Sequence, residues 1–584
     1  MMETREKKEV MQTALGQQKA DLVIVNAKLA NVYTGEVQDD FAVATKGKWI
    51  AYVGKKPHDN IGEETVVIDA AGMTLIPGFI EGHTHLAQMY DAAEFLKAAM
   101  KGGTTTIITE TMEVFPINGY DGVADFLESF REQPLKVYGT APVTISISKA
   151  CNIISLDAMQ KLLSRDDIVG IGESYWQAVL QDPDRFLPLY EEALRRKKTL
   201  EGHSAGARER KLMAYASAGI SSCHEPITAE EVLERLRLGI YVMIREGSIR
   251  RELEAVSRVK DMDVDLRRLI LATDGVDARD LLEKGYMEAL VQKAIDLGFK
   301  PMDALRMATL NVAEHFSLDG LLGGIAPGKY ADIVIIPDLK TIRPLYVVSN
   351  GKIVAKNGEI VIKPRKPVYT DAAYNSIHIP ADFRAEDFLI ASRNDVASVK
   401  VRVIDTVTDL VTKELKTDMA VKDGKIAVDL SRDIIKAAAI DRTRLPVRKF
   451  IGLIKGFNMK TGAFATSTPW DTADIVVVGA DDADMALAVN RVIELKGGMA
   501  VSKNGKIVAE FALPIFGIIS DQPLEALVQS LDSINHAASN LGIPFARPFL
   551  TLQVLTTAAI PYFRICEEGL VNLKDGQTLG LIVD

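Results

Sequence analysis

Two histidines separated by a single residue, His83 and His85, end an apolar run in residues 75–85, which read LIPGFIEGHTH. In a β-strand, side chains at positions i and i+2 point to the same face. The two imidazoles are therefore expected to leave the end of one strand on one side, at a spacing that suits two ligands of a metal ion. For an isolated pair, surface histidines on a polar loop would be the ordinary interpretation.

Four further residues of metal-ligand type end apolar runs that are typical of strands. Glu173 ends the run GIGE, His203 lies in EGH, His224 lies in CHE, and Asp274 lies in ATD. Taken singly, Glu173 could be a solvated acid, Asp274 a helix N-cap, and either histidine a hydrogen-bonded polar group. Together, at strand ends of one barrel, they predict a metal centre. Four other histidines have no such position and are predicted to be surface or packing residues: His58, His315, His378 and His536.

Such a centre predicts hydrolysis. Two divalent cations that share a bridging carboxylate, Glu173, would lower the pKa of a shared water from 15.7 toward about 7 and so provide hydroxide at neutral pH. Asp274 would then take the proton and pass it to the leaving group. The expected reaction is attack on an sp² carbon, at either a C–NH₂ group or a cyclic amide.

The elements that must position these residues alternate between apolar runs and amphipathic helical runs, which is typical of repeated β-α units. Strands are predicted at residues 74–80, 104–109, 135–145, 168–173, 200–203, 220–224, 240–245 and 269–274. Eight such units predict an α/β fold of the (β/α)₈ TIM-barrel type, in which catalytic groups lie at the C-terminal ends of the strands. A doubly wound open sheet is the competing fold, but no predicted strand is followed by a glycine-rich phosphate loop.

Strand-like patterns on both sides of the barrel predict a second, smaller domain. Residues 1–73 and 323–370 would be the N-terminal and return segments of one small β-sandwich domain, which the barrel at 74–322 interrupts. Residues 371–584 mix strands and helices and are predicted to form a separate C-terminal α/β domain. Several domains are the expected division for a chain of 584 residues.

Composition restricts the partners and the compartment. The formal net charge of −10 argues against a nucleic-acid partner, which would need a basic face. The first residues are charged and polar, and no apolar run is long enough to cross a bilayer, so no membrane contact is expected. The three cysteines, Cys151, Cys223 and Cys566, are too widely spaced to predict a disulfide framework. A reducing compartment fits this pattern, and we expect a cytoplasmic protein.

Several motifs resemble the amidohydrolase superfamily and, within it, the bacterial and archaeal adenine deaminases. The barrel motifs are PGFIEGHTH (77–85), EGH (201–203), ATD (272–274) and HEPITAEEVLERLRLGIYVMIREGS (224–248). The later motifs are ALRMATLNVA (304–313), GGIAPGKYADIV (323–334), DDADMALAVN (481–490) and ALPIFGIIS (512–520). The resemblance covers nearly the whole chain from residue 20, including a C-terminal domain that most amidohydrolases lack.

The resemblance implies hydrolytic deamination of adenine to hypoxanthine and ammonia, through a hydroxide that bridges two manganese or iron ions, with zinc as a further option. It also implies a homodimer or larger homo-oligomer. The implied metal ligands are His83, His85, Glu173, His203, His224 and Asp274. Glu225 would be a catalytic acid that protonates or holds a purine ring nitrogen. Arg245, Glu246 and Ser248 would bind substrate, the alternative being a charge pair at the surface.

The chain departs from the family pattern in three places near the expected substrate. Where the family usually reads TDDRH after the eighth strand, this chain reads TDGVD at 273–277. The family's C-terminal HDSHN is replaced by WDTAD at 470–474, and the IESS that follows H-x-H is replaced by LAQM at 86–89. The chain is therefore expected to be a divergent member. Two alternatives stay open: a hydrolase that opens a cyclic amide or ureide of a purine-related or hydantoin-like substrate, and an inactive homologue that binds a nucleobase.

Overall fold

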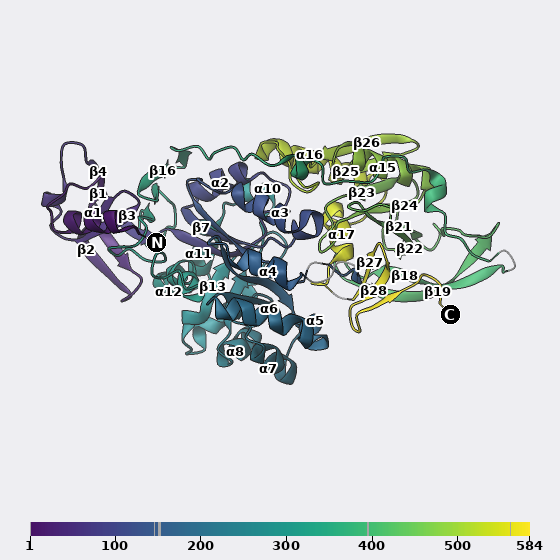
Figure 1. The fold of residues 1–584 in the computed structure, drawn as a ribbon, viewed down its shortest axis with the longest axis horizontal. Helices are drawn as coiled ribbons and strands as arrows, with labels where there is room; N and C mark the ends of the chain where they lie inside the picture. Colours follow the sequence, from purple (N-terminus) through teal and green to yellow (C-terminus); the bar gives the residue numbers. More distant parts are fainter. Residues whose placement is uncertain (1, 145, 150–153, 394–395, 561, 584) are drawn as a thin grey trace.

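The computed structural model describes residues 2–144, 146–149, 154–393, 396–560 and 562–583. The molecule is elongated, with a small sheet that includes β1–β4 at one end, a barrel in the middle and the C-terminal domain at the other end (Figure 1). None of the helices in these residues is both long enough and apolar enough to cross a membrane. Cys223 and Cys566 are buried free thiols, and Cys151 lies outside the described residues.

The small sheet takes strands from both sides of the barrel in the sequence. It has nine strands in the order β17-β16-β15-β14-β5-β1-β2-β3, with β4 paired to β1. Its strands are β1 Leu22–Asn31, β2 Glu36–Lys46, β3 Trp49–Gly54, β4 Val66–Asp69, β5 Thr74–Pro77, β14 Ile333–Ile336, β15 Tyr346–Ser349, β16 Lys352–Lys356 and β17 Glu359–Ile360. β5 pairs with β14 in antiparallel register, which joins the segments before and after the barrel. The helix α1 Thr4–Ala14 packs on β3.

Eight parallel strands in sequential order form the barrel. They are β6 Phe79–Thr84, β7 Thr104–Thr109, β8 Lys136–Ala141, β9 Ile168–Tyr175, β10 Thr199–His203, β11 Ser222–Cys223, β12 Tyr241–Arg245 and β13 Leu269–Ala272. The first and last strands meet where the backbone N–H of Asp274 donates to the carbonyl of His83 at 3.0 Å. Branched and long apolar side chains, among them Ile80, Ile108 and Ile270, fill the interior. The predicted α/β barrel is therefore confirmed.

Helices between the strands, and others after the last strand, β13, cover the outside of the barrel (Figure 1). They are α2 Ala92–Lys101, α3 Phe115–Glu128, α4 Leu156–Leu163, α5 Trp176–Gln181, α6 Pro183–Arg195, α7 Glu209–Ser217, α8 Ala229–Arg237, α9 Leu253–Val256, α10 Ala278–Glu283, α11 Met287–Asp296, α12 Pro301–Met307 and α13 Leu310–His315. The side chain of Thr228 caps α8 by accepting the backbone N–H of Glu231 at 3.2 Å, which fixes where this helix begins.

The predicted strand at 74–80 was wrong as a single element, because Gly78 divides it. Residues before Gly78 form β5 of the small sheet, and residues after it form β6 of the barrel. The N–H of Gly78 donates to the carbonyl of Asp332, and a Cβ at this position would lie 2.3 Å from the hydroxyl of Thr105. Three other predicted strands end earlier or are shorter than expected: β8 ends at Ala141 with Ile145 outside the described residues, β11 has two residues, and β13 ends at Ala272.

The C-terminal domain is built on a nine-stranded sheet in the order β20-β19-β18-β22-β21-β24-β23-β25-β26. The strands are β18 Ser398–Thr406, β19 Thr412–Lys422, β20 Lys425–Ile426, β21 Ile434–Asp441, β22 Lys449–Lys455, β23 Ala463–Thr466, β24 Asp474–Gly479, β25 Gly498–Lys503 and β26 Lys506–Ala512. The remaining elements are α14 Asp371–Tyr374, α15 Asp482–Glu494, α16 Leu524–Ser539, α17 Pro548–Gln553, β27 Phe563–Cys566, β28 Gly569–Asn572 and β29 Gln577–Leu579. In Figure 1, α17 lies on the side of this domain that faces the barrel.

Candidate metal centre

All six predicted ligands lie at the C-terminal ends of barrel strands. His83 is in β6 and His85 follows it, Glu173 is in β9, and His203 ends β10. His224 directly follows β11, and Asp274 lies two residues beyond β13. Because parallel strands end at the same rim of a barrel, residues far apart in sequence converge there.

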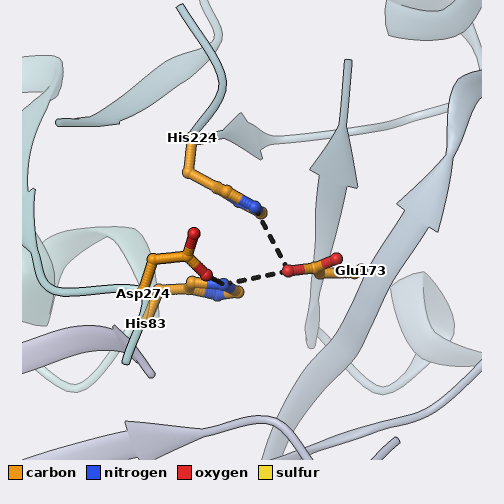
Figure 2. Close-up of side chains that lie close together, drawn as sticks. All are labelled: His83, Glu173, His224 and Asp274. Carbon is orange, nitrogen blue, oxygen red and sulfur yellow. Dashed lines mark hydrogen bonds and ion pairs between the residues drawn. The ribbon is translucent and has the colours of Figure 1, made fainter. Parts of the chain in front are cut away.

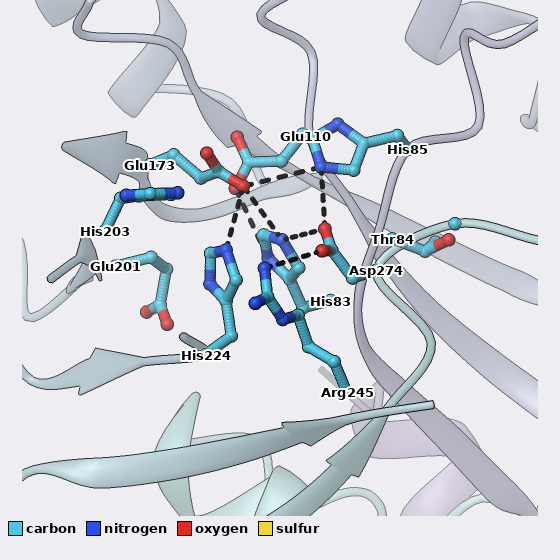
Figure 3. A network of polar contacts seen from close by, with 12 residues as sticks. His83, Thr84, His85, Glu110, Glu173, Glu201, His203, His224, Arg245 and Asp274 are labelled. Atoms are coloured by element: carbon cyan, nitrogen blue, oxygen red, sulfur yellow. Dashed lines mark hydrogen bonds and ion pairs between the residues drawn. The ribbon is translucent and has the colours of Figure 1, made fainter. Parts of the chain in front are cut away.

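Figure 2 shows the imidazoles of His83 and His224 directed at Glu173, and Figure 3 adds that of His85. Oε1 of Glu173 lies 3.1 Å from Nε2 of His83, 3.4 Å from Nε2 of His85 and 3.2 Å from Nε2 of His224. The rings of His83 and His224 stack with centroids 4.2 Å apart. A single carboxylate oxygen therefore faces three ring nitrogens that could each ligate a metal.

Asp274 approaches the same group from the last strand. Its Oδ1 lies 3.4 Å from Nε2 of His83 and 3.2 Å from Nε2 of His85, while its Oδ2 accepts a hydrogen bond from Nη1 of Arg245 at 3.1 Å. Its backbone φ of 55° is left-handed, a conformation that Asp tolerates better than most residues. The ligand atoms of His83, Glu173, His224 and Asp274 all lie within 4.8 Å of one another.

A second group of ligand atoms overlaps the first. His203, His224 and Glu225 also offer ligand atoms that lie within 4.8 Å of one another. Oε1 of Glu225 is 2.9 Å from Nε2 of His224 and 3.8 Å from Nε2 of His203. Figure 3 shows His203 and His85 on opposite sides of Glu173. His224 belongs to both groups, so the cluster can divide into two neighbouring positions.

The donor set fits divalent metal ions. Imidazole nitrogen and carboxylate oxygen suit first-row transition metals, and no thiolate is involved. Buried carboxylates crowded together need a positive charge nearby, and Glu110 adds to this need. Glu110 is 1% exposed, and neither of its oxygens has a hydrogen-bond partner in the described part of the chain, although Oε1 lies 3.7 Å from Nδ1 of His83.

The pKa values of the cluster show strong mutual attraction between its charges. Burial opposes ionisation of Glu173, but the surrounding imidazoles outweigh it and hold the pKa of Glu173 well below its ordinary value. Burial likewise opposes ionisation of Asp274, whose pKa is nevertheless held well below its ordinary value by His83, His85 and Arg245. His203 differs, since burial lowers its pKa. The carboxylates are thus ready to bind a cation.

Two further acids lie beside the histidines, Glu110 and Glu113, and neither was predicted from the sequence. Both follow β7, in the run ETME after the strand TTTIIT. Glu113 pairs with Nδ1 of His85, which leaves Nε2 of that ring directed at Glu173 and Asp274. A metal-binding histidine usually donates its other ring N–H to such a carboxylate. Their position directly after a predicted barrel strand was the feature of the sequence that could have identified them.

A cavity of about 420 Å³ opens beside the cluster. Glu225 and Arg245, two of the four residues predicted to bind substrate, line it. Glu246 and Ser248 are not among its lining residues: Glu246 pairs with Lys293 at 2.7 Å, and Ser248 lies by a smaller neighbouring cavity. The side chain of Arg245, in β12, points toward the cavity. The side chain of the next residue, Glu246, points away from it toward Lys293.

The C-terminal domain closes part of this cavity. It contributes lining residues from two loops: Trp470, Asp471, Thr557, Ala559 and Ile560. Three donors hold Asp471, and burial raises its pKa to about 6. The cavity is therefore lined on one wall by predicted metal ligands from the barrel and on another by residues of the C-terminal domain.

Comparison with known proteins agrees with this division. The amidohydrolase family model matches residues 74–354, and the model of the adenine deaminase C-terminal domain matches residues 409–577. The adenine deaminase of Clostridium botulinum (strain ATCC 19397 / Type A) is 34% identical over 586 aligned residues, which cover 99% of this chain and 98% of that protein. The adenine deaminase of Moorella thermoacetica is 33% identical and covers 98% of both chains. The chain belongs to the adenine deaminase family.

Both matched regions of this adenine deaminase family member contribute to the site. All six predicted ligands fall within the amidohydrolase match, and the cavity-closing residues 470–471 and 557–560 fall within the C-terminal match. Among solved structures, molinate hydrolase superposes with a TM-score of 0.46 at 16% identity, over 57% of this chain and 95% of that one.

Proposed function

We propose that this chain is a metal-dependent hydrolase that converts adenine and water to hypoxanthine and ammonia. The convergence of His83, His85, Glu173, His203, His224 and Asp274 at one barrel rim carries the proposal. Relatives that are named adenine deaminases and align over 98–99% of the chain support the substrate.

The six converging side chains would hold two divalent cations, with manganese or iron as the expected metals and zinc as a further option. Bound cations would supply Lewis-acid activation and lower the pKa of a water toward about 7. Glu173 is the candidate for a bridging ligand, because one of its oxygens faces three imidazoles.

Asp274 would move the proton. Its Oδ1 faces the histidines, and its Oδ2 is held by Arg245. Arg245 is itself fixed by Glu252, to which its Nε and Nη2 donate at 2.8 and 3.0 Å. Since its pKa is low, Asp274 is ionised at neutral pH and can accept a proton from water. It would return that proton to the amino nitrogen that leaves C6 of the purine.

Glu225 would contact the heterocycle. Its Oε2 accepts hydrogen bonds from the backbone N–H of Ser204 at 2.7 Å and from the Ser204 hydroxyl at 3.3 Å. Its side chain lines the cavity beside His203 and His224. A carboxyl group fixed in this way can hold or protonate a ring nitrogen while the amino group leaves.

Ammonia release from adenine by manganese-loaded protein tests the proposal. We expect turnover, and we expect Asp274→Asn to lower kcat by roughly 100-fold or more because it removes the proton carrier. Absence of ammonia from fully loaded wild-type protein would reject adenine as the substrate. Full activity in Asp274→Asn would reject the role of Asp274.

A second candidate function is hydrolysis of a cyclic amide or ureide. It is favoured by the altered groups around the cavity, since Gln88 and Trp470, which lie in two of the departing motifs, both line it. A panel of lactams and ureides, assayed with the same metal-loaded protein, tests this function. Binding of nucleobases without turnover of any compound would instead indicate an inactive homologue.

A further inference from the structure

The turn between β23 and β24 extends from the C-terminal domain to the cavity. Trp470 and Asp471 lie in it, and both line the cavity. The backbone N–H of Trp470 donates to the carbonyl of Gln553 at 2.9 Å, and the hydroxyl of Thr556 donates to the carbonyl of Trp470. The turn is therefore fixed at the cavity wall by two separate backbone contacts.

The two oxygens of Asp471 have different surroundings. Oδ2 accepts three hydrogen bonds: from the hydroxyl of Thr557 at 2.6 Å, from the N–H of Ala558 at 2.9 Å and from the hydroxyl of Tyr175 at 3.1 Å. Oδ1 accepts none from the described residues and is not among their fully buried unpartnered atoms. The saturated oxygen anchors the side chain, and the other oxygen remains available to a molecule in the cavity.

The backbone and the burial of Asp471 restrict where its side chain can lie. Asp471 has a left-handed φ of 59°, a conformation that Asp tolerates better than most residues, and it is only 7% exposed. Here the contacts of Trp470 on one side and the three donors on the other hold the carboxylate in place.

The side chain of Tyr175 connects this carboxylate to the predicted metal cluster. Its ring packs edge-on against the ring of His203, with centroids 5.0 Å apart, while its hydroxyl donates to Asp471. One tyrosine side chain therefore separates Oδ2 of Asp471 from a predicted ligand. Asp471 and the predicted ligands Glu173, His203 and Asp274 line the same cavity, so one bound molecule can contact both groups.

We infer that Asp471 binds substrate, with its Oδ1 accepting the imidazole-ring N–H of a free purine base. The inference rests on the proposed function, in which C6 on the six-membered ring lies at the metal-ligand wall. The imidazole ring then lies at the opposite end and carries the N–H that a glycosidic bond replaces in a nucleoside. The carboxylate thus selects free bases over N9-substituted ones, because an N9-substituted base would leave it desolvated and without a donor.

Asp471→Asn tests the inference with little change in shape. Since three donors must keep an acceptor, the amide oxygen stays at the position of Oδ2 and the amide nitrogen faces the cavity. We expect kcat/KM for adenine to fall roughly 10- to 100-fold, the value of a hydrogen bond to a charged group. Bound metal per chain stays unchanged. Asp481→Asn is the matched control, because Asp481 caps α15 at an exposed position and Asn caps equally well.

Selectivity distinguishes substrate binding from a structural role. Purine and 9-methylpurine carry no leaving group, so their equilibrium binding can be compared directly. Wild-type protein should bind purine at least tenfold more tightly than 9-methylpurine, and Asp471→Asn should lose most of this preference. An equal loss for both ligands, or an unchanged preference, overturns the inference.

The binding measurement also separates this inference from the proposed function. If loaded wild-type protein releases no ammonia from adenine, the proposed reaction fails. A preference for purine over 9-methylpurine that depends on Asp471 would still support the inference, and its absence would overturn it. Thr557→Val, which removes one donor to Oδ2 but keeps the carboxylate, should weaken purine binding less than Asp471→Asn.

Discussion

The buried imidazole of His83 lies beside the carboxylates of Glu173 and Asp274, whose negative charge must be balanced by a proton or a cation. Burial and the neighbouring His224 oppose its protonation, but hydrogen bonds to Asp274 and Glu173 outweigh them and raise the pKa of His83 to about 9. Without metal, His83 therefore carries a proton at neutral pH. A metal ion binds the deprotonated ring, so protons and metal compete for the same site.

We predict that manganese affinity falls as the pH is lowered from 9 to 6. The sign follows from the raised pKa, because more protons must be displaced at lower pH. The loss should approach tenfold per pH unit for each proton displaced. Titration calorimetry in buffers of different ionisation enthalpy should show proton release on binding. Equal affinity at pH 6 and pH 8 would contradict the prediction.

Glu113 should affect metal binding without being a ligand. It pairs with Nδ1 of His85 and so fixes the direction of Nε2. We predict that Glu113→Ala weakens manganese binding roughly 10- to 100-fold, and that Glu113→Gln weakens it less because the amide oxygen still accepts from the ring. Competition with a chelator measures the affinity. Glu128→Gln, at an exposed position of α3, should bind manganese like the wild type.

At the level of the elements, the strand β9 shows why glycine is needed near Glu173. A Cβ at Gly172 would lie 2.0 Å from Oε2 of Glu110 and 2.8 Å from the hydroxyl of Thr140. A Cβ at Gly170 would lie 2.9 Å from the carbonyl of Thr199 on the neighbouring strand. The run GIGE therefore lets two strands and a buried acid approach closely just before the predicted bridging ligand.

Gly172→Ala should destabilise the barrel by about 1–3 kcal/mol, the usual cost of overpacking. It should also weaken metal binding, since Glu110 must move away from His83. Urea denaturation and chelator competition measure the two effects. Gly320→Ala is the control, because no atom lies within 4 Å of a Cβ at that position. Equal stability of the two variants would show that the barrel relaxes freely around residue 172.

Most elements of the barrel could be predicted because hydrophobic runs mark strands and helices separately. The exceptions were positions whose structure depends on contacts with residues distant in the sequence. Gly78 ends one strand and starts another in a different sheet, which apolar periodicity does not reveal. Glu246 was placed in the pocket with its neighbour Arg245, but adjacent residues at the end of a strand point to opposite sides, and Lys293 binds it there.

For the whole molecule, the two walls of the cavity differ in how far sequence can predict them. The convergence of the six predicted ligands could be foreseen because all strand ends of a barrel meet at one rim. The opposing wall comes from residues 470–471 and 557–560, in a different domain, and no local pattern predicts which of its loops reach the rim. Glu110 and Glu113 are an intermediate case. They follow a predicted strand, but they face Nδ1 of the predicted ligands His83 and His85 and not Nε2.

Because the barrel supplies the predicted ligands and the C-terminal domain supplies Trp470, we predict that Trp470 controls substrate affinity and not metal content. Its side chain lines the cavity and the smaller neighbouring one, where Val276 and Leu527 also lie. Trp470→Ala should raise KM for adenine about tenfold or more by removing a large apolar contact surface, and Trp470→Phe should raise it less. Bound manganese per chain should equal that of the wild type in both variants. Loss of metal together with activity in Trp470→Ala would mean that the C-terminal domain shapes the metal centre itself, because the barrel alone would then be unable to hold its ligands in place.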